Sequence, residues 1–122
     1  MPKIFTCFIP TLPPGINKTY LIRQGGKGLA LTKEARDWDK KAALIIGAEA
    51  GLQDWQYEPG FGYGLVIIWG GGYHDADAHL KLVQDCVSRK LGFDDRYIVK
   101  SVIERRKHWD GLYVGLAAIE LG

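Results

Sequence analysis

Runs of apolar residues divide the chain into predicted β-strands. Residues 4–9 form a short run rich in β-branched and aromatic side chains, and Pro10 ends it. Phe61 to Trp69 is rich in valine, isoleucine and aromatic residues, so we expect it to form the central, buried strand. The remaining strands are predicted at 20–22 and 29–31, which pair as a hairpin, and at 97–105 and 112–121, joined as an antiparallel hairpin through Trp109-Asp110-Gly111.

Two further segments carry apolar residues at the three-to-four-residue spacing of a helix. The first follows Thr32, a predicted N-cap, and we expect Gly51 to end it. The second begins near residues 75–77 and precedes Gly92, which stands where a left-handed C-terminal cap is expected. The resulting order of strands and helices predicts one α+β domain over residues 1–122, with two main helices packed on a mixed or antiparallel sheet.

Composition supports a globular domain and excludes several classes of protein. Of the 122 residues, 47% are hydrophobic and 25% are charged, which rules out a disordered or collagen-like chain. The longest uncharged run, residues 59–73, contains six glycines and is too short to cross a bilayer, so we expect no membrane partner. Cys7 and Cys86 have neither the number nor the spacing of a disulfide framework or a cysteine metal site, so we expect a cytoplasmic location.

Charge is distributed unevenly along the chain, although the net charge is only +2. Residues 1–41 contain eight lysines and arginines against three acids, whereas residues 42–77 contain five acids and no lysine or arginine. Four more basic residues cluster near the C-terminal end, at Lys100, Arg105, Arg106 and Lys107. Basic ends around an acidic middle suit a nuclease, in which cations hold phosphates and carboxylates hold a metal ion, while solvated surface charge is the alternative.

Ionisable residues concentrate directly after the predicted central strand. Asp75 and Asp77 are two apart, so in an extended segment their side chains project to the same side. The N-terminus of the following helix favours negative charge and keeps both carboxylates ionised. Carboxylate oxygens suit Mg²⁺ or Mn²⁺, which also hold substrate phosphates. Lys81 follows one helical turn after Asp77, close enough for its ammonium group to reach a phosphate beside the metal.

Two other interpretations of this segment remain open at this point. Acids and bases alternate every four residues, which is also the pattern of a surface salt-bridge series, at Asp77, Lys81, Asp85 and Arg89. His74 and His79 would make a softer metal box around the same aspartates, and nitrogen ligands favour zinc over magnesium.

The order and spacing of these motifs resemble a known family. Asp75-x-Asp77-x-x-x-Lys81 is followed by Asp85, Gly92 and Asp94-Asp95 just before a strand, and residues 13–18 read Pro-Pro-Gly-Ile-Asn-Lys. Over nearly the whole chain, this arrangement resembles the RusA-type endonucleases, the Holliday junction resolvases common in phages and prophages. The resemblance implies a homodimeric, Mg²⁺-dependent endodeoxyribonuclease that resolves branched DNA by paired symmetric nicks in recombination and repair.

The resemblance also implies roles for individual residues. The metal ligands would be Asp75, Asp77 and Asp95, with Lys81 as the catalytic lysine. Our candidates for contacts to the DNA backbone are Lys18, Arg23, Arg105 and Lys107, because basic side chains position a nucleic acid without reading its sequence. Asn17 is a further candidate, either for a contact to DNA or for holding its own loop.

Some positions depart from the family pattern and support other functions. Ala78 stands where the family usually has Asn, and His74 stands where a basic residue, often Arg, is common. These departures favour the alternative of a non-catalytic homologue that binds DNA junctions. A third hypothesis is a small metal-dependent hydrolase of nucleotides, for which His74 and His79 are the only support.

Chain length limits where Asp95 can lie. If residues 77–91 are helical, the two ends of that helix are about 21 Å apart. The residues from 91 to 95 can return at most about 13–14 Å, so Asp95 stays several ångström short of Asp75 and Asp77 in the same chain. We therefore expect Asp95 to complete the metal site from a second copy of the chain, across a two-fold axis.

Overall fold

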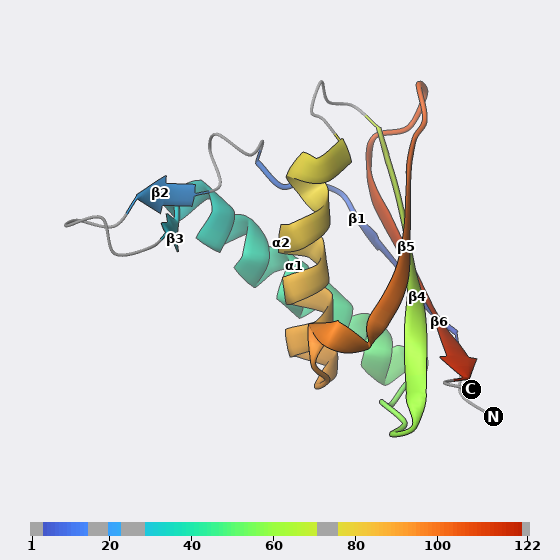
Figure 1. Cartoon of the computed structure of the whole chain (residues 1–122). Helices are drawn as coiled ribbons and strands as arrows, with labels where there is room; N and C mark the ends of the chain where they lie inside the picture. Colours follow the sequence, from blue (N-terminus) through green and yellow to red (C-terminus); the bar gives the residue numbers. More distant parts are fainter. Residues whose placement is uncertain (1–3, 15–19, 23–28, 71–75, 121–122) are drawn as a thin grey trace.

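The computed structural model places two helices against one face of a four-stranded sheet (Figure 1). It describes residues 4–14, 20–22, 29–70 and 76–120. In chain order the described elements are β1 (Phe5–Ile9), β2 (Tyr20–Ile22), β3 (Leu29–Leu31), α1 (Lys33–Leu52), β4 (Phe61–Gly70), α2 (Ala76–Leu91), the 3₁₀ turn η2 (Asp95–Tyr97), β5 (Ile98–Arg105) and β6 (Gly111–Glu120). The predicted α+β class, with two main helices and a mixed sheet, is confirmed.

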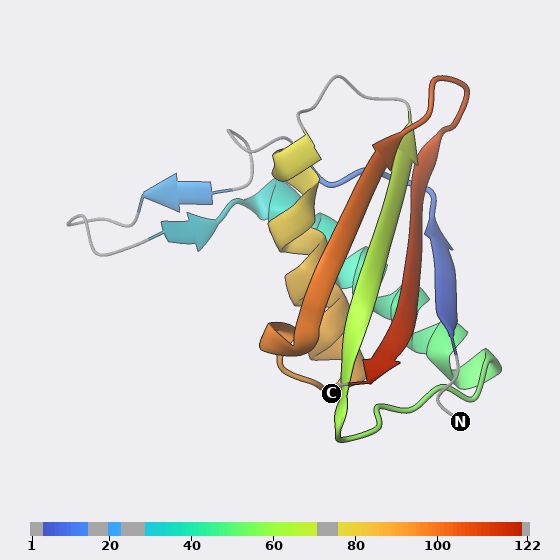
Figure 2. The ribbon, with the colours of Figure 1, turned by 45° about the vertical axis from the view of Figure 1, so that its right-hand side comes forward.

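The strand order in the main sheet is β1-β6-β4-β5. β4 pairs with β5 in parallel and with β6 antiparallel, and β6 also pairs antiparallel with β1. The parallel pair is joined through α2, because two parallel strands need a crossover connection. The predicted hairpin of 20–22 with 29–31 is confirmed as β2 and β3, which extend away from the main sheet in Figures 1 and 2.

The predicted hairpin between residues 97–105 and 112–121 is wrong. β4 lies between β5 and β6, since its two edges pair with different strands over most of its length. The connection from β5 to β6 therefore passes over the end of β4, where the backbone N–H of Arg106 donates to the carbonyl of Trp69 at 2.9 Å. Gly70 permits this close crossing, because a Cβ there would collide with the backbone carbonyl of Trp109.

The two helices bury one face of the sheet. Alternate residues of β4 point into this layer, and Tyr63, Leu65, Ile67 and Trp69 are all buried. Apolar residues at helical spacing cover them, namely Ala35, Trp38, Ala42 and Ile46 from α1 and Leu82, Val83, Cys86 and Val87 from α2. A cluster of aromatic rings closes the layer at one end, made of Trp55, Tyr57, Tyr63 and Phe93.

The ends of the helices follow local rules in three of four cases. Thr32 caps α1 as predicted, since its hydroxyl accepts from the N–H of Ala35 at 3.2 Å. The second helix begins at Ala76, inside the expected range, and Gly92 ends it with a φ of +84°. The expectation that Gly51 ends α1 is wrong, because the helix continues through Leu52.

Candidate functional site

The N-terminal part of α2 carries the central residues of the predicted site. Asp75 lies outside the described residues. Asp77 is the second residue of α2, and only its backbone is described. Lys81 lies one turn further along the helix and is exposed. One more turn leads to Asp85, so three charged residues follow each other at four-residue intervals on the same helix.

The carboxyl group of Asp85 interacts with that of Asp95. The two carboxyl groups are close enough for each to affect the charge of the other, although ten residues separate them in sequence. The pKa of Asp85 is raised, first by partial burial and then by the hydrogen bond and the negative charge of Asp95. Lys81 and Arg89 act in the opposite direction and lower this pKa. The site therefore holds a pair of acids with a lysine beside it.

The chain returns to Asp85 through a tight turn after α2. The N–H groups of Gly92 and Phe93 both donate to the carbonyl of Ser88, at 2.9 and 3.0 Å, which completes a Schellman-type cap. Phe93 is buried in the aromatic cluster. Asp94 then caps the turn η2, since its carboxylate accepts from the N–H of Arg96 at 3.0 Å. This sequence of contacts holds Asp95 against the C-terminal half of α2.

Asp95 is consequently distant from Asp77 in the same chain. Asp85, its contact partner, follows Asp77 by eight residues, which is about 12 Å along a helix axis. A carboxylate ligand binds Mg²⁺ at about 2.1 Å, so one ion would not contact the carboxylates of Asp77 and Asp95 from one chain in this arrangement. Among the described residues, no group of three or more histidine, cysteine, aspartate or glutamate side chains is placed to hold a metal.

The alternative interpretation, a surface series of salt bridges along α2, agrees with the structure only in part. Lys81 and Asp85 do interact, but Arg89 forms its ion pair with Asp39 of α1. This contact raises the pKa of Arg89 and joins the two helices. Asp85 interacts with Asp95 as well as with Lys81 and Arg89, so the charges on α2 are not only a series of intrahelical pairs.

The candidate DNA contacts fall into two groups. Asn17, Lys18 and Arg23 lie outside the described residues. Arg105 ends β5 and Lys107 follows it, and both are exposed. Arg105 is the register partner of Trp69, one residue from the end of β4, and α2 begins six residues beyond that end. The end of β5 and the start of α2 lie at the same end of the sheet in Figures 1 and 2, so Arg105 and Lys107 lie at this end too.

The two histidines near the predicted site and the two cysteines add no metal ligands that the structure describes. His74 lies outside the described residues, and only the backbone of His79 is described. Cys7 and Cys86 are buried, and burial raises the pKa of each thiol to about 12, so both remain protonated and unreactive. No helix within the described ranges is long and apolar enough to cross a membrane.

Sequence reasoning did not find the contact between Asp85 and Asp95. The available signal was Gly92, which predicts a reversal of the chain and thus a return of the following acids toward α2. The position along α2 beside which these acids lie depends on a tertiary contact, the burial of Phe93. Comparison with known proteins adds no assignment, because neither the known family models nor the curated proteins include a match to this chain.

Proposed function

We propose that this protein is a metal-dependent endodeoxyribonuclease that resolves four-way DNA junctions by paired nicks, as the RusA-type endonucleases do. The observation that carries the proposal is the arrangement along α2. An exposed lysine, Lys81, lies one turn after Asp77 and one turn before Asp85, whose carboxyl group contacts Asp95. Carboxylates on either side of a lysine along one helix can supply metal ligands and a cation for a phosphate.

The donor set suits a hard divalent cation. All the proposed ligands are carboxylates, whose oxygens are the ligands that hard divalent cations prefer. Asp75 and Asp77 would hold Mg²⁺ or Mn²⁺ together with Asp95. The ion would supply the positive charge that neutralises the scissile phosphate and lowers the pKa of the attacking water.

The chain's own residues supply the other parts of the mechanism. The ammonium group of Lys81 would stabilise the negative charge that develops on the phosphate or on the leaving oxygen in the transition state. Arg105 and Lys107, exposed at the same end of the sheet, would hold the DNA backbone without reading its sequence. These contacts would orient a strand across the start of α2.

Two copies of the chain would be needed for a complete site. Asp95 lies beside Asp85, about 12 Å along α2 from Asp77, so we infer that Asp95 of the partner subunit completes the metal site. A two-fold axis then creates two equivalent sites, which suits two symmetric cuts in one junction. We place this activity in the cytoplasm, where buried free thiols such as those of Cys7 and Cys86 remain reduced.

Junction cleavage tests the activity directly. A synthetic four-way junction and a linear duplex of the same sequence are incubated with Mg²⁺, Mn²⁺ or EDTA. We expect paired nicks in the junction alone, lost in EDTA, and below about 1% of the wild-type rate in Asp77→Asn. Asp37→Asn, which changes an exposed aspartate of α1, is the matched control and should cleave as the wild type does.

The outcomes also separate the alternatives. Metal-independent binding of the junction without nicks would indicate the non-catalytic homologue that Ala78 and His74 favour. Hydrolysis of free nucleotides, with the junction left intact, would indicate the small hydrolase. Equal cleavage rates for the wild type and Asp77→Asn would show that Asp77 is not needed for cleavage and would contradict the proposed site.

The shared site has its own test. Asp75→Asn and Asp95→Asn proteins are each expected to bind Mn²⁺ weakly, whereas their mixture should regain one tight site per mixed pair. Calorimetric titration with Mn²⁺ measures this. No recovery in confirmed mixed dimers would place all ligands in one chain.

A further inference from the structure

The face of the sheet opposite the helices, here called the outer face, carries exposed aromatic and aliphatic side chains (Figure 2). Alternate residues of each strand form a row on this face. In β6 the buried residues are Leu112, Val114 and Leu116, so the odd-numbered residues point outward. Exposed apolar side chains collected on one face mark an interaction surface more often than isolated ones do.

The outward row of β6 alternates aromatic rings with residues that have little or no side chain. We call it the β6 row, and it consists of Trp109, Gly111, Tyr113, Gly115 and Ala117, with Trp109 placed just before the strand. Gly115 leaves space beside the ring of Tyr113, since even a Cβ there would lie 3.5 Å from that ring. Flat groups therefore find both rings and open space along one line of the sheet.

A third ring joins the β6 row at the end of the sheet. Gly70 and Gly111 are register partners, and their missing side chains leave room that other residues fill. A Cβ at Gly70 would collide with Trp109, and a Cβ at Gly111 would lie 2.8 Å from the Cζ of Phe8. Phe8 is 50% exposed and is the register partner of Tyr113. The rings of Trp109, Phe8 and Tyr113 thus lie next to one another on the outer face.

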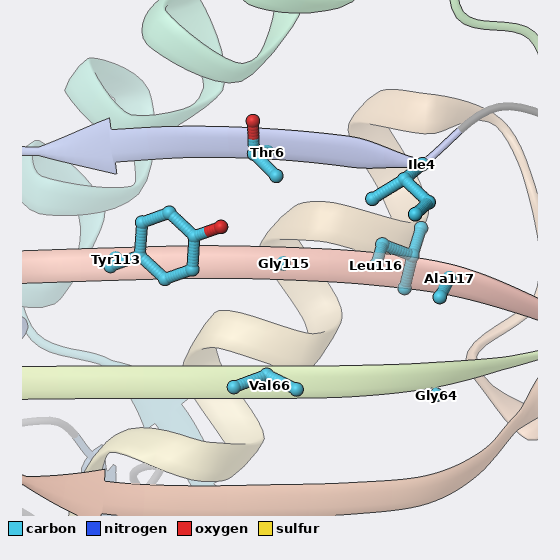
Figure 3. A pocket seen from close by; sticks show the side chains of 8 residues that line it. All are labelled: Ile4, Thr6, Gly64, Val66, Tyr113, Gly115, Leu116 and Ala117. Atoms are coloured by element: carbon cyan, nitrogen blue, oxygen red, sulfur yellow. The ribbon is translucent and has the colours of Figure 1, made fainter.

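Beyond Tyr113 the β6 row borders a hollow of about 220 Å³ (Figure 3). Gly64 and Gly115 form its floor, and Tyr113 and Ile4 rise at its borders. The only polar side chains that line it are those of Thr6 and Tyr113. The hollow therefore suits a flat, largely apolar group and offers few hydrogen bonds for recognising one particular group.

Cations lie at both ends of this path of rings. Residues 105–107 read Arg-Arg-Lys, and all three are exposed. The guanidinium group of Arg106 lies over the ring of Trp109, with its Cζ 4.9 Å from the ring centroid. At the other end, exposed Lys100 is the register partner of Gly64 in the floor of the hollow.

The acids at this end of the sheet are fewer than the cations. Glu104 lies 3.4 Å from Arg106, but the two side chains stay 53% and 44% exposed. Asp110 is the other acid of the connection. An exposed ion pair of this kind contributes little stability, so a phosphate can replace Glu104 as the partner of Arg106.

We propose that the outer face binds an unpaired nucleic-acid strand along the β6 row. Bases stack on Trp109, Phe8 and Tyr113, one base enters the hollow, and Arg106 and Lys107 hold phosphates. Stacking on aromatic side chains beside basic residues is a general way of binding single strands, because every base has an aromatic face. Since the hollow offers few hydrogen-bonding groups, we expect little preference for sequence.

Charge favours a nucleic acid over a protein as the ligand. An apolar protein surface would cover the rings but would leave the consecutive cations at residues 105–107 without partners of opposite charge. A nucleic-acid strand supplies both an aromatic face and a phosphate at every nucleotide. This binding goes beyond the proposed nuclease function, since it needs neither a metal ion nor a second copy and lies opposite α2 and η2 (Figure 1).

Tryptophan fluorescence tests the contact in the full chain. Trp38, Trp55 and Trp69 are at most 6% exposed, so Trp109 is the tryptophan that a ligand reaches most easily. An oligothymidylate of about 15 nucleotides, added in EDTA so that no metal-dependent cleavage occurs, should quench the emission until the site is saturated. A hairpin duplex of the same length should bind more weakly and quench less.

Variants of the rings separate stacking from attraction by charge. Trp109→Ala and Tyr113→Ala should each weaken binding of a fluorescently labelled oligothymidylate by about 5- to 150-fold, measured by anisotropy. Trp109→Phe and Tyr113→Phe keep a ring and should bind within a few-fold of the wild type. Leu44→Ala is the matched control, because Leu44 is exposed on α1 away from this face and its loss should change nothing. Circular dichroism verifies that each variant is folded.

The inference and the proposed nuclease function fail separately. Asp77→Asn should bind the oligothymidylate as the wild type does, even if no junction is cleaved by either protein. No binding by the wild type at about 100 μM oligothymidylate overturns the inference and leaves the β6 row to a protein or to solvent. Equal affinities for the wild type and both alanine variants, or tighter binding of the duplex than of the single strand, overturn it as well.

Discussion

The two faces of the main sheet differ in what covers them, although the sequence of β4 is apolar on both. Leu65, Ile67 and Trp69 are buried under the helices, whereas Val66 on the other face is 36% exposed. Strands covered on both sides have nearly continuous apolar sequences, and strands covered on one side alternate with polar residues. The helices α1 and α2 thus account for the apolar residues on one face of β4, whereas Val66 on the other face is partly exposed.

The helix-covered side also carries the ionisable residues of the proposed active site. Lys81 and the Asp85–Asp95 pair lie on α2 and η2, and charges are scarce in the rows of the outer face. The proposed site therefore lies on the helix side of the sheet, while the other face of the sheet is mostly apolar. The following variants test this division, from the largest expected effect to the smallest.

Shortening a valine to alanine should lower the free energy of unfolding more on the helix-covered face of the sheet than on the open face. Val114 is fully buried in β6, and its register neighbour on β4 is Ile67; Val66 lies on the open face one residue away. In dilute, monomeric protein, Val114→Ala should lower the free energy of unfolding by about 2–3 kcal/mol, and Val66→Ala by less than about 1 kcal/mol. Urea unfolding measures both, and equal losses would contradict the difference between the faces.

Alanine substitutions at Gly70 and Gly115 should differ in their effect on stability, because only Gly70 is crowded by neighbouring backbone. Gly70→Ala would collide with the backbone of Trp109, so we expect a loss of about 1–3 kcal/mol in the free energy of unfolding. Gly115→Ala meets the ring of Tyr113 at 3.5 Å, an ordinary contact, and should change monomer stability by less than about 1 kcal/mol. Urea unfolding measures both changes, and equal losses would contradict the difference between the two positions.

The cysteines report whether the helix-covered face is closed. Burial raises the pKa of Cys7 and of Cys86 to about 12, so at pH 8 the reactive thiolate is a very small fraction of each. Native protein should therefore gain no mass from iodoacetamide over an hour at pH 8, whereas the denatured chain should be alkylated at both positions. Rapid labelling of the native chain would indicate that this layer opens frequently.

Local sequence signals predicted the elements but not all of their pairings. Both helices, the β2–β3 hairpin and the caps at Thr32 and Gly92 follow from residues close in sequence. Residues 109–111 do form a turn between β5 and β6, as the sequence predicted. A turn alone does not determine whether the two strands that it joins are hydrogen-bonded to each other. In the structure β4 lies between β5 and β6 and pairs with both, and α2 connects it to β5.

Tertiary contacts also explain the two remaining differences. α1 continues past Gly51 to Leu52, and Gln53, directly after it, accepts from the N–H of Thr6 and donates to the carbonyl of Thr6 in β1. The rise of a helix limited how far Asp95 can return, but only the burial of Phe93 fixes it beside Asp85.

The most direct test of the shared metal site is anomalous scattering from crystals soaked in Mn²⁺. We expect a peak bonded to Asp75 and Asp77 of one copy and to Asp95 of the partner subunit, with carboxylate oxygens about 2.1–2.2 Å away. No peak beside Asp75 and Asp77, or a peak whose ligands all come from one chain, would contradict the site as proposed.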